Sequence, residues 1–258
     1  MVPGNHDIDR DAIKPGHASY FWDLLEAPEG VDDKYDRVNM FLRDGVERAS
    51  FFSGLGNFCQ FTHDFYGDSR LAFDHDAYYS VRSIDKDGRH IVVMGLNSAW
   101  LSLKEDDPKH QVGQQGRLLL GEQQVCDAEN KALQGGPNPC LFIVLIHHPI
   151  YWLAEKDIHR VQQHLPRFCD LLLHGHLHCP SYFAQTTPDW RVHEFAAGAS
   201  WKESWHAYNL VKLSLDSGFG SAIVQCQHPQ LSVDWRPDTY TYHHAKNGRI
   251  RWKVKLRA

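Results

Sequence analysis

The chain has 258 residues, a formal net charge of −5, 42% hydrophobic residues and 23% charged residues. This length and composition predict one globular domain with a sizeable core. The net charge gives no bulk indication of nucleic-acid binding, which leaves only a local basic patch open. No leader pattern and no apolar run near the ~20 residues of a membrane span occur. Six cysteines without a Cys-x-x-Cys pair indicate reduced thiols, so we expect a cytoplasmic protein.

The first third of the chain predicts a loop followed by helices. Residues 3–16 are rich in Pro, Gly, Asn and Asp, which is typical of turns. Residues 17–66 are aromatic with helical patterns, and we expect a cap-like layer that serves as a lid or as an interface to a partner or a second copy. Residues 77–84 and 90–96 then predict two strands joined by a turn.

The remainder alternates helices and strands and then becomes mostly strand. A helix is predicted over 121–133, and a short amphipathic helix over 158–165. The apolar runs 141–146 and 171–173 are typical of strands that are covered on both faces. Residues 192–258 predict a C-terminal sheet. The order indicates a single α/β domain over 1–258.

Histidines follow both of the predicted buried strands. His147 and His148 come directly after the first strand, and His174, His176 and His178 end the second. Because the carboxyl ends of strands in open α/β sheets assemble sites, we expect these clusters to meet. In an extended chain, His176 and His178 would point to one side. Neutral imidazole is a common metal ligand, so the pattern favours a metal site over ordinary loop histidines.

A third polar block, Gly4-Asn5-His6-Asp7, stands near the start of the chain. Taken alone it predicts a simple turn, because all four residue types suit turns. Beside a metal, the amide oxygen of Asn5 could bind the ion without adding charge. His6, with one ring nitrogen held by Asp7, could donate a proton to a leaving alkoxide.

Together, Gly4-Asn5-His6-Asp7, Ile146-His147-His148-Pro149 and Gly175-His176-Leu177-His178 resemble the calcineurin-like metallophosphoesterase superfamily. The family pattern is Asp-x-His, Gly-Asp-x-x-Asp, Gly-Asn-His-Asp/Glu, a strand-end His and Gly-His-x-His, and this chain matches the last three motifs. The resemblance implies a four-layer α/β/β/α sandwich. It also implies hydrolysis of phosphodiesters or phosphomonoesters with two divalent ions, which would be Mn, Fe or Zn.

The resemblance also implies a role for individual residues. His6, steadied by Asp7, would act as the acid. His148 would be structural or lie behind the ligands, and His174 would face away. If the loop after Leu96 faces the metals, Asn97 and Trp100 would lie near the mouth of the site, where Trp100 could stack on a base, although a buried position is favoured for this aromatic. The implied ligands of the second metal are Asn5, His147 and His176, that of the first metal is His178, and the implied substrate contacts are Asn97 and Trp100.

The sequence departs from the family where Asp-x-His and the metal-bridging Asp are expected, upstream of Gly4. We therefore expect an N-terminally truncated chain that holds at most one ion weakly and is impaired as it stands. The missing strands would leave 141–146 and 171–173 with an unpaired edge and an exposed apolar face. Asp157-Ile158-His159 has the letters of the first motif, but it lies in a helical stretch, and we expect it at the surface.

Three functions fit these observations. The first is a metal-dependent phosphoester hydrolase, or the larger part of one. The alternative is a non-catalytic metallophosphoesterase-fold relic or binding module, which contacts a partner through 17–66. The third is a structural zinc protein held by His147, His176 and His178, and it ranks last because structural zinc sites favour cysteine.

Overall fold

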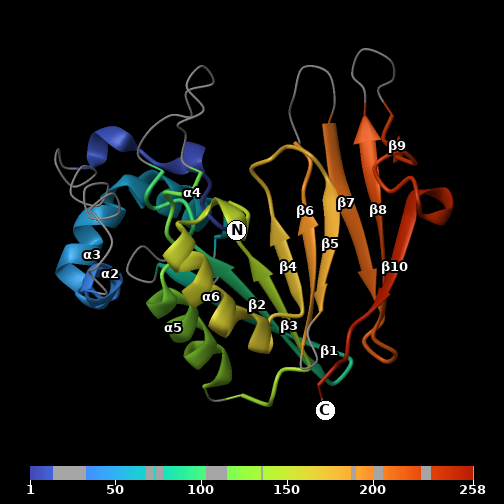
Figure 1. The fold of residues 1–258 in the computed structure, drawn as a ribbon, viewed down its shortest axis with the longest axis horizontal. Coiled ribbons are helices and arrows are strands. Elements are labelled where there is room, and N and C mark those ends of the chain that lie inside the picture. The colour runs from blue at the N-terminus through green and yellow to red at the C-terminus, as the bar shows by residue number, and fades with distance from the viewer. Residues whose placement is uncertain are drawn as a thin grey trace.

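The computed structural model of the chain describes residues 1–13, 33–67, 73, 78–102, 115–134, 136–186, 190–199, 206–227 and 234–257. Residues 17–32, the first part of the predicted cap-like segment, lie outside these ranges. The described residues form a layer of helices, a six-stranded sheet and a four-stranded sheet (Figure 1). The predicted α/β class is confirmed.

The six-stranded sheet contains both apolar runs as central strands. Its order is β1-β2-β3-β4-β6-β5. The four inner strands are parallel, and each edge strand is antiparallel to its neighbour. The strands are Tyr79–Lys86 (β1), Arg89–Leu96 (β2), Leu141–Leu145 (β3), Leu171–His174 (β4), Ser181–Thr186 (β5) and Arg191–Ala196 (β6).

The expectation that β3 and β4 would have an unpaired edge is wrong. β3 pairs with β2 on one side and β4 on the other, and β4 pairs with β3 and β6. Leu141, Val144 and Leu172 are buried, with at most 2% of each exposed. The outer neighbours of these two strands come from the chain itself. β2 precedes β3 in sequence and pairs with it, and β6 follows β4 and pairs with it.

Helices cover one face of this sheet and one end of the molecule (Figure 1). The two that pack beside it are Glu122–Leu133 (α5) and Glu155–Phe168 (α6). The helices at the end are Asp33–Arg43 (α2), Gly45–Phe51 (α3) and Gly56–Tyr66 (α4), and the 3₁₀ turns are Asn5–Asp7 (η1), Arg10–Ala12 (η2), Phe52–Leu55 (η3), Ile150–Trp152 (η4) and Lys246–Gly248 (η5). In the part of the chain that the structure describes, every helix is too short or too polar to cross a bilayer.

The second sheet packs against the other face of the first. Its strands are His206–Leu213 (β7), Phe219–Gln227 (β8), Arg236–Pro237 (β9) and Arg249–Lys253 (β10), in the order β10-β8-β7 with β9 beside β8. Leu171 and Phe195 share a core cluster with Ala222 and Trp252. The described residues thus form three layers. The fourth predicted layer, which would be helices outside the second sheet, is not among the described residues (Figure 1).

Asp157 ties α6 to the start of α5. Its carboxylate accepts hydrogen bonds from the backbone N–H groups of Leu120 at 2.6 Å and Gly121 at 3.1 Å. The side chain is fully buried, so the expectation of a surface position is wrong. Helix starts leave backbone N–H groups without partners inside the helix, and a neighbouring carboxylate satisfies them here. Burial raises the pKa of Asp157 from 3.8 to about 7, although the two N–H donors act in the opposite direction.

We predict that Asp157→Ala lowers the free energy of unfolding by about 2 kcal/mol, because two buried N–H groups lose their acceptor. Urea denaturation followed by circular dichroism measures the change. Lys156→Ala, at an exposed position of the same helix, is the control and should change stability little. An equal loss in both variants would contradict the role given to Asp157.

The raised pKa predicts a pH dependence of stability. The folded state holds the Asp157 proton more tightly than the unfolded chain does. The stability that this group contributes is therefore present below about pH 4 and is lost as the pH rises to about 7. Asp157→Asn removes the titration. Relative to Asp157→Asn, the wild type should lose free energy of unfolding as the pH rises from 4 to 7. A constant difference between the two proteins would contradict this.

Candidate metal centre

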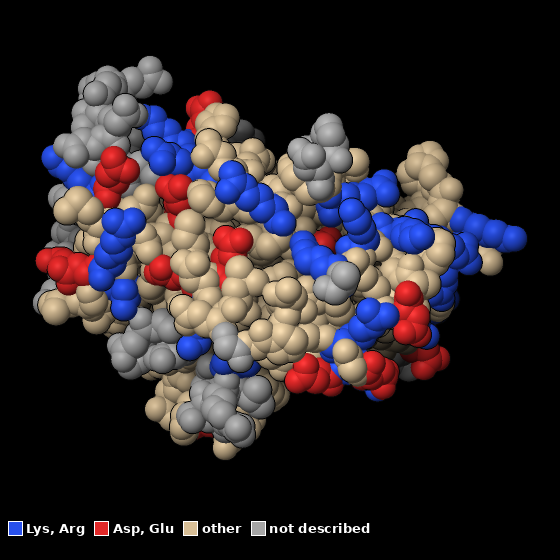
Figure 2. Space-filling model, turned by 90° about the horizontal axis from the view of Figure 1, so that it is seen from below, with Lys and Arg blue, Asp and Glu red and all other residues tan. Residues whose placement is uncertain are grey.

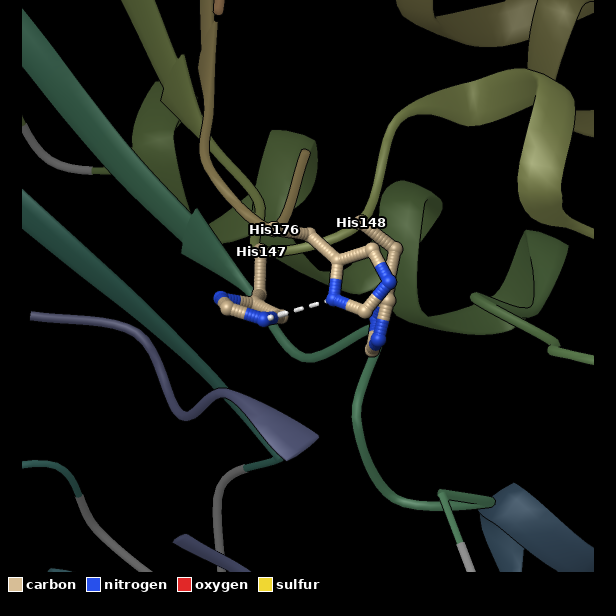
Figure 3. A group of neighbouring side chains, drawn as sticks. All are labelled: His147, His148 and His176. Carbon is tan, nitrogen blue, oxygen red and sulfur yellow. Dashed lines mark hydrogen bonds between the residues drawn. The ribbon is translucent and has the colours of Figure 1, made fainter. Parts of the chain in front are cut away.

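Three histidines meet at the carboxyl ends of β3 and β4. His147 and His148 follow β3, and His176 follows β4 (Figure 3). One ring nitrogen from each lies within 4.8 Å of those of the other two. The two loops are joined by a hydrogen bond from the backbone N–H of Gly175 to the carbonyl oxygen of His147, at 3.0 Å. Parallel pairing of the strands thus brings distant histidines together.

The N-terminal turn adds an amide oxygen to this cluster. His147 Nε2 lies 2.9 Å from Asn5 Oδ1 and 3.3 Å from His176 Nδ1. The turn packs directly on the imidazole, since a Cβ atom at Gly4 would lie 2.8 Å from both Cε1 and Nδ1 of His147. A glycine at position 4 is therefore required for Asn5 to approach His147.

The Gly-His-x-His loop does not have the extended backbone that we expected. His176 and His178 have φ angles of +66° and +57°, in the left-handed region. The loop is bent by a short hydrogen-bonded turn, in which Leu177 N donates to Gly175 O at 2.8 Å. The prediction of an extended backbone at His176 and His178 is wrong. His178 is exposed and lies outside the cluster of three.

His148 joins the cluster, although the motif pattern predicts it outside the ligand set. Its ring centroid lies 4.7 Å from that of His147 and 4.5 Å from that of His176. Its Nδ1 is 3.1 Å from both Oγ and the carbonyl oxygen of Ser98. Its Nε2 is buried without a hydrogen-bond partner among the described residues. The sequence signal that could have placed His148 in the cluster is its position directly after His147 at a strand end.

Two imidazoles of the cluster, those of His147 and His148, are held in the neutral form. Burial, followed by repulsion from His176, His6, His178 and His174, lowers the pKa of His147 to about 3. Burial, followed by repulsion from His147 and His176, lowers the pKa of His148 to about 2. A divalent cation binds the neutral imidazole, so both rings are ready for metal at neutral pH.

His6 and Asp7 occupy η1 beside the cluster. The His6 side chain is exposed. The Asp7 carboxylate accepts from Gly4 N at 2.8 Å, and Asp7 N donates to Gly4 O at 3.0 Å. Asp7 thus closes the turn that carries Asn5 and His6, and its hydrogen bond goes to this backbone rather than to the His6 ring. A hollow of about 390 Å³ adjoins His6 and Asp7 and is also lined by Asn57 and Phe61.

Asn97 and Trp100 lie in the core rather than at the mouth of the site. Each has at most 1% of its surface exposed. Asn97 Oδ1 accepts from Ala99 N at 3.0 Å, and Trp100 packs edge-on against Phe52 at 5.8 Å between ring centroids. The loop after β2 turns inward under the helices, so the structure gives neither side chain a surface for substrate. His174 is also occupied elsewhere, with Nε2 3.0 Å from Glu194 Oε1.

The donor set fits a divalent transition metal. It offers one amide oxygen and three imidazoles, of which that of His148 is buried, and the cluster of described residues includes no carboxylate. Imidazole with an oxygen ligand suits Zn, Mn or Fe. The buried Nε2 of His148 also lacks a protein partner in the part of the chain that the structure describes. An ion close to His147 and His176 would supply one.

Comparisons with known proteins bear on this site. No protein-family model matches the chain. An uncharacterized metallophosphoesterase-like protein of Bacillus subtilis (strain 168), YydB, is 22% identical over 259 residues, which cover 98% of this chain and 49% of YydB. The chain thus spans about half the length of this curated relative. Among solved structures, the sulfate thiohydrolase SoxB of Thermus thermophilus in complex with glycerol aligns with 52% of this chain and 22% of its own, at 19% identity. Its TM-score of 0.35 is too low to carry an argument about the fold.

The match to YydB extends over almost all of this chain. It confirms the resemblance of the chain to the calcineurin-like metallophosphoesterase superfamily.

Proposed function

We propose that the chain is a metal-dependent phosphoester hydrolase, or the larger part of one, acting on phosphodiesters or phosphomonoesters. The observation that carries the proposal is the convergence of Asn5 Oδ1, His147 Nε2 and His176 Nδ1 within hydrogen-bonding distances of 2.9 and 3.3 Å. These atoms come from three separate segments, and their common chemistry is the capacity to bind a cation. The match to a metallophosphoesterase-like protein supports the reaction class.

The ligands in this proposal are Asn5, His147 and His176, with the exposed His178 available to a second ion. None carries a negative charge, so they do not offset the charge of a divalent cation, and one weakly held ion is the expected occupancy of the chain as it stands. When bound, a divalent ion polarises the phosphoryl group and activates the attacking water.

The residues of η1 perform the remaining roles. His6 is exposed beside the cluster and donates a proton to the departing oxygen, which is the usual task of a general acid. Asp7 is a positioning residue, because its hydrogen bond to Gly4 N fixes the turn that presents His6. The hollow beside His6, with Phe61 on its wall, receives the leaving group.

We predict that His6→Ala lowers turnover of bis-p-nitrophenyl phosphate roughly 100-fold and leaves bound metal unchanged, because a general acid contributes to rate and not to metal affinity. His176→Ala should lower both quantities. Elemental analysis gives the metal content, and release of p-nitrophenolate gives the rate. His159→Ala, an exposed histidine on α6, is the control for loss of an imidazole.

Two outcomes would overturn parts of this proposal. If His6→Ala removes the metal, His6 is a ligand and not the acid. If the wild-type chain binds one ion or none and shows no turnover, the chain is the non-catalytic relic or binding module instead.

We also predict that Gly4→Ala weakens metal binding at least tenfold without unfolding the protein. The added methyl group would lie 2.8 Å from two atoms of the His147 ring, so the turn or the ring must move and Asn5 leaves His147. Titration with Zn²⁺ followed by calorimetry measures the affinity. Gly56→Ala is the matched control, because a Cβ there meets nothing within 4 Å. Unchanged affinity in Gly4→Ala would exclude Asn5 as a ligand.

A further inference from the structure

The outer face of the four-stranded sheet carries several exposed side chains, although Ile223 and His206 on this face are buried. Val211, Ala222 and Trp252 point inward and pack in the core between the two sheets. Because side chains alternate along a strand, their neighbours in β7, β8 and β10 point outward. The outward set includes Tyr208, Leu210, Lys212, Phe219, Ser221, Arg249, Arg251 and Lys253.

This sheet has the opposite charge to the chain as a whole. Residues 206–227 and 234–257 contain eight Lys or Arg and three Asp, whereas the full chain has a net charge of −5. β7, β8 and β10 contain no acidic residue at all. Figure 2, which views the molecule from below, shows Lys and Arg on both halves, with several of them on the half that carries this sheet. The local basic patch left open by the bulk charge is therefore present.

Strand register arranges the cations around the middle of the face. Ser221 pairs with Arg251 on one side and with Lys212 on the other, so all three lie in one row across the sheet. Arg249 Nη1 donates to Ser221 Oγ at 3.4 Å. A hollow of about 450 Å³ is lined by Lys212, Ser221, Arg251 and Phe219. Two cations and a hydroxyl around one hollow are suited to a phosphate group.

Exposed aromatic rings flank these cations along the strands. Phe219, at one end of β8, is 60% exposed, and Lys253 Nζ lies 5.0 Å from the centre of its ring. Toward the other end, Tyr208 pairs with Gln225 and packs against Trp235 at 4.9 Å between ring centroids. Phe219 and Gln225 are six residues apart, so the two aromatic groups are separated by about 20 Å along the sheet.

We propose that this face binds single-stranded nucleic acid. The phosphates contact Lys212, Arg251 and Lys253, and unpaired bases stack on Phe219 and on Tyr208 with Trp235. Sheet faces that combine cations with exposed aromatic rings bind single strands in this way, since every base offers a face for stacking. An acidic protein segment would need only the cations and would not account for the rings. The face belongs to the second sheet, whereas the metal centre lies on the first, so the proposal is independent of hydrolysis.

The test is the binding of a fluorescein-labelled 15-mer of dT, followed by anisotropy with EDTA present to prevent hydrolysis. We expect saturable binding that weakens steeply with salt, and at least tenfold weaker binding to a 15-bp duplex, whose bases cannot stack. Arg251→Glu should weaken binding at least tenfold and make its salt dependence shallower, because a phosphate contact is lost. Phe219→Ala should weaken binding about fivefold or more at every salt concentration.

Matched controls lie away from the proposed face. Lys86→Glu reverses an exposed cation of β1, and Phe65→Ala removes a 63% exposed ring from α4. Both should bind the 15-mer as the wild type does, and thermal unfolding verifies that every variant is folded. Equal binding of duplex, equal competition by polyglutamate, or no effect of Phe219→Ala would each overturn the proposal and leave a nonspecific cationic surface or a site for acidic protein segments.

Discussion

The parallel pairing of β3 with β4 is the constraint on which the candidate centre depends. Register places Leu145 beside Leu173, and Ile146 N then donates to the carbonyl oxygen of Leu173 at 3.0 Å. His147 therefore leaves the sheet beside His174, at the same edge. The two histidine-bearing loops start from adjacent points of a buried layer, and little freedom remains in where their side chains can lie. Packing of the sheet, rather than affinity of the histidines for one another, holds like groups together.

Protonated imidazoles this close together would repel one another. The fold avoids this repulsion at His147 and His148 because burial keeps both rings uncharged. Burial lowers the pKa of both His147 and His148 far below neutrality. His147 Nε2 can donate to Asn5 Oδ1 and His148 Nδ1 to the carbonyl oxygen of Ser98, which satisfies part of the polar surface of these rings. The Asn5 turn closes this arrangement from the opposite side, and its approach depends on the absence of a side chain at Gly4.

Much of the fold and part of the site could be predicted from the sequence. The apolar runs predicted the central strands, and the helix predicted over 121–133 is found at Glu122–Leu133. The motifs identified Asn5, His147 and His176, which the structure brings together. Sequence could not supply what depends on pairing and burial. β2 and β6 fill the edges thought to be open, and His148 turns toward the cluster. The left-handed conformations of His176 and His178 were also missed, since nothing in the letters distinguishes them from extended chain.

Those two conformations have a consequence for how the loop can change over time. A residue with a Cβ atom is strained at positive φ, and Gly or Asn would tolerate positions 176 and 178 better than histidine does. Substitution by these residues would make the loop more stable and would remove its imidazoles one at a time. A lineage that keeps histidine at both positions therefore keeps a less stable loop. Selection for ligand binding, and not for folding, is the force that could sustain that choice.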